Sequence, residues 1–107
     1  MNLKSDNAGP AHPEVMQALA EANAGFALPY GGDDATRAAC DRLRAEFEAP
    51  EAAVHLVATG TAANALALAT MAQPWQTVFC TPLAHIHTDE CQAPEFYTGG
   101  AKLTLAG

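Results

Sequence analysis

The first half of the chain shows the three-to-four-residue apolar spacing of two helices. The first helix opens at residues 12–14, where Pro13 takes a first-turn position that it tolerates and Glu14 is favourable near the positive helix end. Gly25 is placed to cap the far end of this helix. Its apolar stripe comprises Val15, Met16, Leu19, Ala20 and Ala22.

A second helix follows a loop at residues 26–32. Asp33 or Asp34 caps its start, it runs to about Glu48, and Pro50 ends it. One side of this helix is apolar and carries Ala39, Cys40, Leu43 and Phe47.

Residues 52–72 predict a strand, a turn and a helix. Residues 52–58 are apolar and partly β-branched, which is typical of a buried strand, and residues 65–72 are rich in Ala and Leu, which favours a helix. The turn between them is Thr59-Gly60-Thr61-Ala62-Ala63-Asn64.

This arrangement gathers unpaired backbone N–H groups at the positive end of a helix, where a phosphate binds well. Gly60 lets the backbone approach the phosphate, and the hydroxyls of Thr59 and Thr61 can donate to its oxygens. An ordinary threonine cap after a glycine turn accounts for the same residues, so the motif alone leaves both interpretations open.

Two further strands are expected, at residues 77–80 and 102–105. Between them, the polar segment 81–91 predicts a loop that enters a short helix ending near residues 93–94, and Gly99-Gly100 predicts a turn. Strands that alternate with helices indicate an α/β fold with a parallel or mixed sheet.

Length and charge limit the classes of protein. The 107 residues allow one domain at most, and a formal charge of −7 argues against nucleic acid or an anionic membrane as partner. No apolar run approaches a transmembrane helix, and the N-terminus lacks the pattern of a signal peptide. The three cysteines show no C-x-x-C spacing, so we expect reduced thiols in a cytoplasmic protein.

Alanine dominates the apolar content. It supplies 25 of the 53 apolar residues, and because alanine buries little area the chain builds only a thin core. The sequence also stops after an expected strand with no closing helix. We therefore expect residues 1–107 to be part of a larger fold.

Four short motifs, in this order and at this spacing, resemble those of low-specificity L-threonine aldolases. They are Lys4-Ser5-Asp6-Asn7, Tyr30-Gly31-Gly32-Asp33, the turn at 59–64, and Ala84-His85 with Glu90. That family uses pyridoxal 5'-phosphate (PLP) and has the fold type I architecture of aspartate aminotransferase. The resemblance implies that this chain is the N-terminal portion of the PLP-dependent major domain, an α/β unit with a mostly parallel sheet. It also implies an amino-acid-metabolising lyase that cleaves threonine and similar β-hydroxy-α-amino acids to glycine and an aldehyde.

The resemblance also assigns cofactor-binding residues. Gly60 and Thr61 match the phosphate cradle, and Asn64 supports it one turn further on. His85 matches the histidine that stacks on the cofactor ring, a place suited to a flat imidazole. Without the resemblance, His85 is simply a histidine of a polar loop.

Three residues match positions closer to the substrate. Ser5 resembles the hydroxyl that contacts the substrate carboxylate, Glu90 a family acid near the site, and Tyr30 a loop tyrosine that meets the active site across a subunit interface. The resemblance thus implies a homo-oligomer, a dimer or tetramer. Alternatively, Ser5 belongs to an exposed arm and Tyr30 only closes a turn.

The chemistry also requires a lysine that forms a Schiff base, and neither Lys4 nor Lys102 matches it. By itself, the chain is therefore expected to be inactive. A β-eliminating lyase or an aminotransferase is the alternative within the superfamily.

Two further hypotheses come from other classes. A metal-binding protein would use His85, His87, Asp89, Glu90 and Cys91, although two histidines two residues apart diverge on a helix. A non-catalytic binding module that keeps only the first part of the fold would self-associate through its exposed sheet edge.

Overall fold

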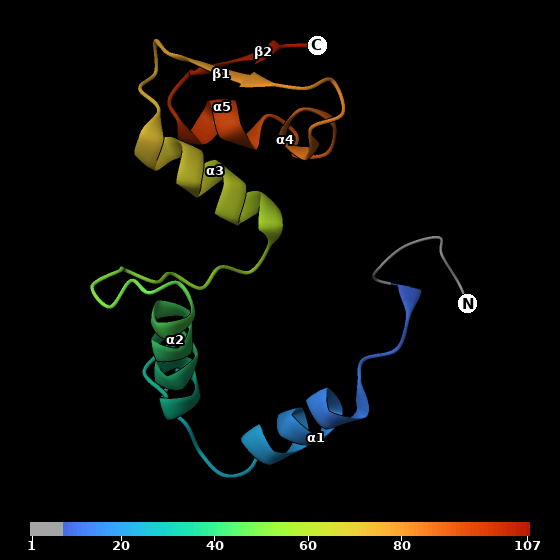
Figure 1. Ribbon diagram of the computed structural model, residues 1–107, viewed down its shortest axis with the longest axis vertical. Coiled ribbons are helices and arrows are strands. Elements are labelled where there is room, and N and C mark those ends of the chain that lie inside the picture. Colours follow the sequence, from blue (N-terminus) through green and yellow to red (C-terminus); the bar gives the residue numbers. More distant parts are fainter. Residues whose placement is uncertain (1–7) are drawn as a thin grey trace. The chain divides into compact units, whose positions relative to one another are not determined.

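The computed structural model describes residues 8–107. The described residues divide into two compact units, one that ends at Val54 and one that spans His55–Gly107. Ser5 and the other residues of the Lys4-Ser5-Asp6-Asn7 motif lie outside the described residues. Figure 1 draws the first unit in blue to green and the second in green through yellow to red.

The first unit contains two helices, α1 (Pro13–Ala22) and α2 (Asp34–Glu46). His12 caps α1 and Asp33 caps α2, as the pattern of the sequence predicted for the start of each helix. Asn23 caps the C-terminal end of α1, two residues before Gly25, whose φ of +82° places it in the left-handed region just beyond the helix. Neither helix buries a residue.

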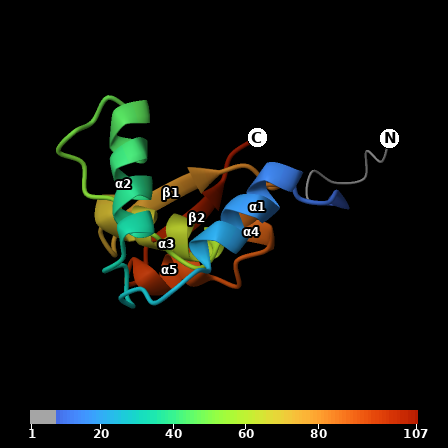
Figure 2. The ribbon, with the colours of Figure 1, turned by 90° about the horizontal axis from the view of Figure 1, so that it is seen from below.

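The second unit contains three helices and a parallel pair of strands. Helix α3 (Gly60–Met71) precedes strand β1 (Thr77–Cys80), the short helices α4 (His85–Thr88) and α5 (Ala93–Tyr97) follow, and strand β2 (Lys102–Leu105) comes last. β1 and β2 lie side by side in both views (Figure 2), with Thr77 opposite Lys102 and Cys80 opposite Leu105. The connection between them carries α4 and α5, and α5 packs against α3.

A small core holds this second unit together. Ala65 of α3 and Ala101 before β2 are its buried apolar residues, and Pro94 and Thr98 of the α5 region are buried with them. The Thr98 hydroxyl donates to the Pro94 carbonyl at 2.8 Å and accepts from the Ala101 N–H at 3.1 Å, which ties α5 to the start of β2. The core of this unit is small, as the alanine-rich composition predicted.

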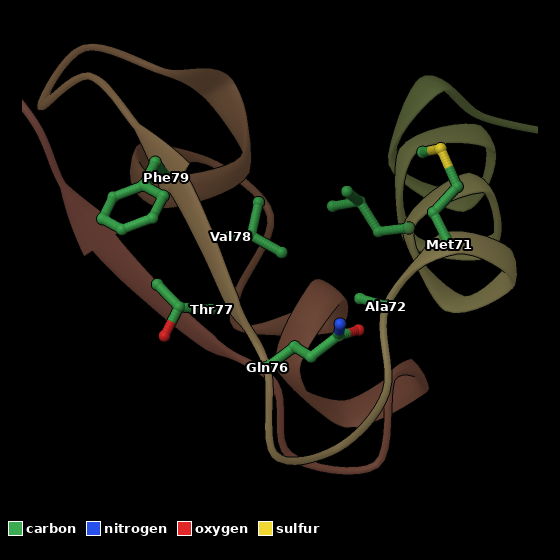
Figure 3. Close-up of a pocket in the computed structure, with 7 residues that line it drawn as sticks. Met71, Ala72, Gln76, Thr77, Val78 and Phe79 are labelled. Atoms are coloured by element: carbon green, nitrogen blue, oxygen red, sulfur yellow. The ribbon is translucent and has the colours of Figure 1, made fainter.

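An open groove lies between α3 and β1 (Figure 3). Val78 reaches from β1 toward α3, whereas Thr77 and Phe79 leave the other side of the strand, which matches the alternating exposure along β1. The lining is mainly apolar and consists of Leu68, Met71, Ala72, Gln76, Thr77, Val78 and Phe79. None of these side chains titrates near neutral pH, so the groove carries no acid–base chemistry of its own.

Both expected strands in the second half are confirmed with their bounds, and so is the α/β character with a parallel sheet. The expected strand at 52–58 is wrong: these residues are not part of any ladder within residues 8–107. An apolar run supplies the side chains of a strand but not the neighbouring strand whose backbone must pair with it.

Two helix boundaries also differ from the prediction. α3 begins at Gly60 and not near residue 65, so the residues expected as a turn form its first turn after the cap at Thr59. The short helix expected to end near Pro94 is present as α4 but ends earlier, at Thr88, and a separate helix, α5, begins at Ala93 with Pro94 in its first turn. Proline is accommodated because N–H groups in the first turn have no acceptor within the helix.

Candidate functional site

Two polar side chains of the second unit, those of Asn64 and His85, converge on the carboxylate of Glu90. Oε1 of Glu90 accepts a hydrogen bond from Asn64 Nδ2 at 2.7 Å and lies 2.8 Å from Nδ1 of His85. The Glu90 side chain is fully buried, whereas the His85 side chain is 66% exposed. The sequence-predicted residues Asn64, His85 and Glu90 are therefore brought together, with the acid inside and the imidazole at the surface.

Local structure explains how the three residues meet. Asn64 lies one turn after Gly60 in α3, and His85 is the first residue of α4. Glu90 precedes two left-handed residues, Cys91 with φ +50° and Gln92 with φ +61°. The Glu90 carbonyl accepts from the Ala93 N–H at 2.9 Å, so this tight turn reverses the chain immediately after the carboxylate.

The charges of this cluster favour the protonated imidazole. The hydrogen bond with Glu90 raises the pKa of His85 above its ordinary value, and the negative charges of Asp89 and Glu90 act in the same direction. Partial desolvation of the ring opposes this rise. His85 therefore stays protonated to a higher pH than a free histidine.

One carboxylate oxygen of the cluster has no partner. Oε2 of Glu90 is buried and makes no hydrogen bond to any of residues 8–107. Oε2 of Glu95 in α5 is likewise buried and makes no hydrogen bond to these residues. Neither of these unpaired oxygens was predictable from the sequence, because both depend on how the connection between β1 and β2 folds. Asn64 and His85 therefore both bond to the same oxygen of Glu90, Oε1.

The start of α3 is the second part of the site. The Thr59 hydroxyl oxygen accepts from the Ala62 N–H at 3.1 Å, which leaves the N–H groups of Gly60 and Thr61 without an acceptor in the helix. The first turn carries no acidic side chain, and a β-carbon at Gly60 would meet no atom within 4 Å. This helix end thus combines free donors, open space and an uncompensated dipole, which suits an anion.

Asn64 makes a contact that the sequence did not predict, because its amide nitrogen donates to Glu90. Its expected support of a phosphate one turn after Gly60 stays a prediction. Asn64 and Glu90 are 26 positions apart, so no local spacing indicates their contact. The hydrogen bond links the helix with the free N-terminus to the segment that carries His85.

Tyr30 belongs to the first unit, where it is fully exposed and has a φ of +58° in the loop before α2.

Among residues 8–107, no three His, Cys, Asp or Glu side chains converge to hold a metal, so the metal hypothesis gains no support from His85 and His87. None of the helices within residues 8–107 is both long enough and apolar enough to cross a membrane.

Comparison with known proteins decides the family. A family model for β-eliminating lyases matches residues 2–107. The chain belongs to this family. Its relatives include the low specificity L-threonine aldolases of Pseudomonas aeruginosa and of a Pseudomonas species, 47% and 43% identical over 102 residues. Both matches cover 95% of this chain and 29% of the relative, so the chain spans less than a third of these proteins.

A solved structure of Leishmania major threonine aldolase is similar with a TM-score of 0.79 and 31% identity, covering 92% of this chain and 28% of that one. The resemblance to threonine aldolases and the fold type I prediction are therefore confirmed. This chain carries the portion of that fold that contains two features. They are the start of α3, whose first turn has no acidic side chain, and the contacts of Glu90 with Asn64 and His85.

Proposed function

We propose that the protein to which this chain contributes is a PLP-dependent lyase that cleaves threonine and related β-hydroxy-α-amino acids to glycine and an aldehyde. The chain supplies its phosphate-binding end. Support comes from the names of the two bacterial relatives and the Leishmania structure, which are all threonine aldolases. The observation that carries the proposal is the acid-free start of α3, tied through Asn64 and Glu90 to His85.

The described residues fit the cofactor. The free N–H groups of Gly60 and Thr61 would hold its phosphate, and the exposed imidazole of His85 would lie flat against its ring. When bound, PLP supplies the electron sink that stabilises negative charge on the α-carbon of an amino acid. This chain's residues bind and orient the phosphate and the ring.

Other parts of the proposal concern the whole protein. Ser5 would contact the substrate carboxylate, and Tyr30 would reach the site of a second copy in a homo-oligomer. The lysine that carries the cofactor would lie outside residues 1–107, because Lys102 opens strand β2 and Lys4 belongs to the N-terminal motif. A cytoplasmic location would suit an enzyme of amino-acid metabolism with reduced thiols.

Two substitutions at His85 test the cofactor assignment in the full-length protein. His85→Phe keeps a flat aromatic ring, and His85→Ala removes it. A lost aromatic contact costs about 1 kcal/mol, so we expect His85→Ala to weaken PLP binding roughly fivefold and His85→Phe to bind nearly as wild type. A titration followed by PLP absorbance measures both. Equal affinity of all three proteins would exclude His85 as the ring contact.

The reaction is tested by its products. Incubation of the PLP-loaded protein with threonine is expected to release glycine and acetaldehyde. Release of a keto acid and ammonia would instead identify a β-eliminating lyase or an aminotransferase. Lys102→Arg serves as a control, because a lysine at the start of β2 has no part in the proposed chemistry and its loss should leave turnover unchanged.

A further inference from the structure

We propose that Glu90 and Asn64 are positioning residues for His85. The Asn64 amide holds the Glu90 carboxylate, and this carboxylate holds the imidazole with Nδ1 protonated and Nε2 left as an acceptor. The importance of this arrangement for catalysis rests on the proposed function, whereas the arrangement itself rests only on the geometry of the second unit.

The chemistry of the two groups identifies the donor in the contact between Glu90 and His85. A carboxylate oxygen only accepts, so the 2.8 Å contact between Oε1 of Glu90 and Nδ1 of His85 requires the proton on Nδ1. A neutral imidazole carries a single N–H, and its other nitrogen is then an acceptor. Glu90 thereby selects one tautomer of His85.

Glu90 and His85 differ in their exposure to solvent. The carboxylate of Glu90 is fully buried, so it has no access to a ligand at the surface, whereas most of the His85 ring is accessible. Any effect of Glu90 on a bound molecule must therefore pass through the imidazole. The hydrogen bond also restrains the plane of the ring, and a fixed plane is what a stacked contact needs.

Asn64 supports the buried carboxylate of Glu90. Oε1 receives both hydrogen bonds while Oε2 receives none from residues 8–107, so the buried carboxylate depends on the Asn64 amide and on His85 alone. Leaving a buried charged group with fewer donors is costly. Asn64 thus fixes the carboxylate against α3, and the tight turn at Cys91 and Gln92 fixes its backbone.

The structure offers a matched control. The charged groups that act on His85 are Glu90 and Asp89, but only Glu90 makes a hydrogen bond to the ring. Asp89 instead accepts from the Thr88 hydroxyl. Asp89→Asn and Glu90→Gln therefore both replace a carboxylate near His85 with an amide. Only Glu90→Gln removes the carboxylate that makes the hydrogen bond to the ring.

Heteronuclear NMR of the histidine ring nitrogens in the full-length protein, recorded across pH, tests the proposal. In the wild type, neutral His85 should be the Nδ1–H tautomer. Glu90→Gln should lower the pKa of His85 and reverse the major tautomer, whereas Asp89→Asn should lower the pKa slightly and leave the tautomer unchanged. Asn64→Leu, of similar size but without a donor, should shift the tautomer in the same direction as Glu90→Gln and by less.

The outcomes that overturn the proposal are distinct. An Nε2–H tautomer in the wild type overturns it without any variant, so it stays testable even if Glu90→Gln fails to fold. Unchanged tautomers in Glu90→Gln or in Asn64→Leu would also overturn it. A parallel PLP titration separates the two proposals: a wild type with the Nδ1–H tautomer that binds no PLP would end the proposed function and leave the positioning role intact.

Discussion

The caps of helices α2 and α3 make the same kind of hydrogen bond, but only the cap of α2 carries a negative charge. In each, a side-chain oxygen of the cap accepts from the N–H three residues later: Asp33 from Thr36 at 2.8 Å and Thr59 from Ala62 at 3.1 Å. Helix α2 has the carboxylate of Asp33 at its positive end, and α3 has none.

This difference separates a helix start that is complete from one that is open. At α2 the positive end is compensated by Asp33, and Asp34 in its first turn pairs with Arg37. At α3 the neutral Thr59 satisfies one backbone N–H and leaves the dipole for another anion. The lesson is that the charge of a cap, more than its hydrogen bond, indicates whether a helix end is available to a ligand.

The largest predicted effect comes from exchanging the charge of the α3 cap. Thr59→Asp keeps a side chain that caps well, but it places a negative charge where the phosphate is proposed to bind. Repulsion between such charges at an effective dielectric near that of a protein surface costs about 2 kcal/mol, or roughly thirtyfold in affinity. A PLP titration of the full-length protein measures this loss.

The reciprocal exchange, Asp33→Thr, is the control for this prediction. It removes a charge from α2 and keeps a hydroxyl cap, so PLP affinity should not change by a comparable factor. Equal losses in the two variants would mean that overall charge governs binding, and the distinction between the two helix ends would then fail.

A smaller effect is expected from removing the α3 cap altogether. Thr59→Ala leaves the Ala62 N–H without its side-chain acceptor, and losing such a cap destabilises a protein by about 1 kcal/mol. Thr59→Ser retains the hydroxyl and should stay within a few tenths of a kcal/mol of wild type. Chemical denaturation of the three proteins measures the difference, and an unaffected Thr59→Ala would show that the cap bond does not hold the start of α3.

The smallest effect is a pH dependence confined to α2. Hydrogen bonds from the Thr36 hydroxyl and backbone lower the pKa of Asp33 below its ordinary value of 3.8. The ionised form thus favours the folded helix, so its contribution is fully present above the ordinary value and is lost as the pH falls through the lowered one. Acid titrations followed by far-UV circular dichroism should show this loss in the wild type and a weaker one in Asp33→Asn, which caps without titrating. Identical profiles would contradict it.

The sequence predicted best those elements that local signals define. Strands β1 and β2 were found with their bounds because breakers flank them, Pro74 before the first and Gly99-Gly100 before the second. The starts of α1 and α2 were found because capping depends on neighbouring residues. The strand at 52–58 failed because strand formation depends on a partner that the segment itself does not contain.

The site divides in the same way. Gly60 and Thr61 were recognisable from the glycine-containing turn before a helix, although that helix was expected to begin near residue 65. His85 and Glu90 were recognisable from a resemblance to a family. The shared oxygen that joins Asn64 and His85 was not predictable, because it requires α3 to pack beside a carboxylate that is far away in the sequence. Local chemistry is visible in a sequence, whereas the geometry between distant elements is not.

Ala65, the residue after Asn64, has no exposed surface in a helix that packs against α5. A larger side chain would have to displace α3, and overpacking of this kind costs roughly 1–3 kcal/mol. The displacement would carry Asn64 and the free helix end away from Glu90. The small side chain of Ala65 therefore lets α3 lie close enough for Asn64 to bond to Glu90. A larger residue at this position is expected to weaken that hydrogen bond as well as the packing of α3.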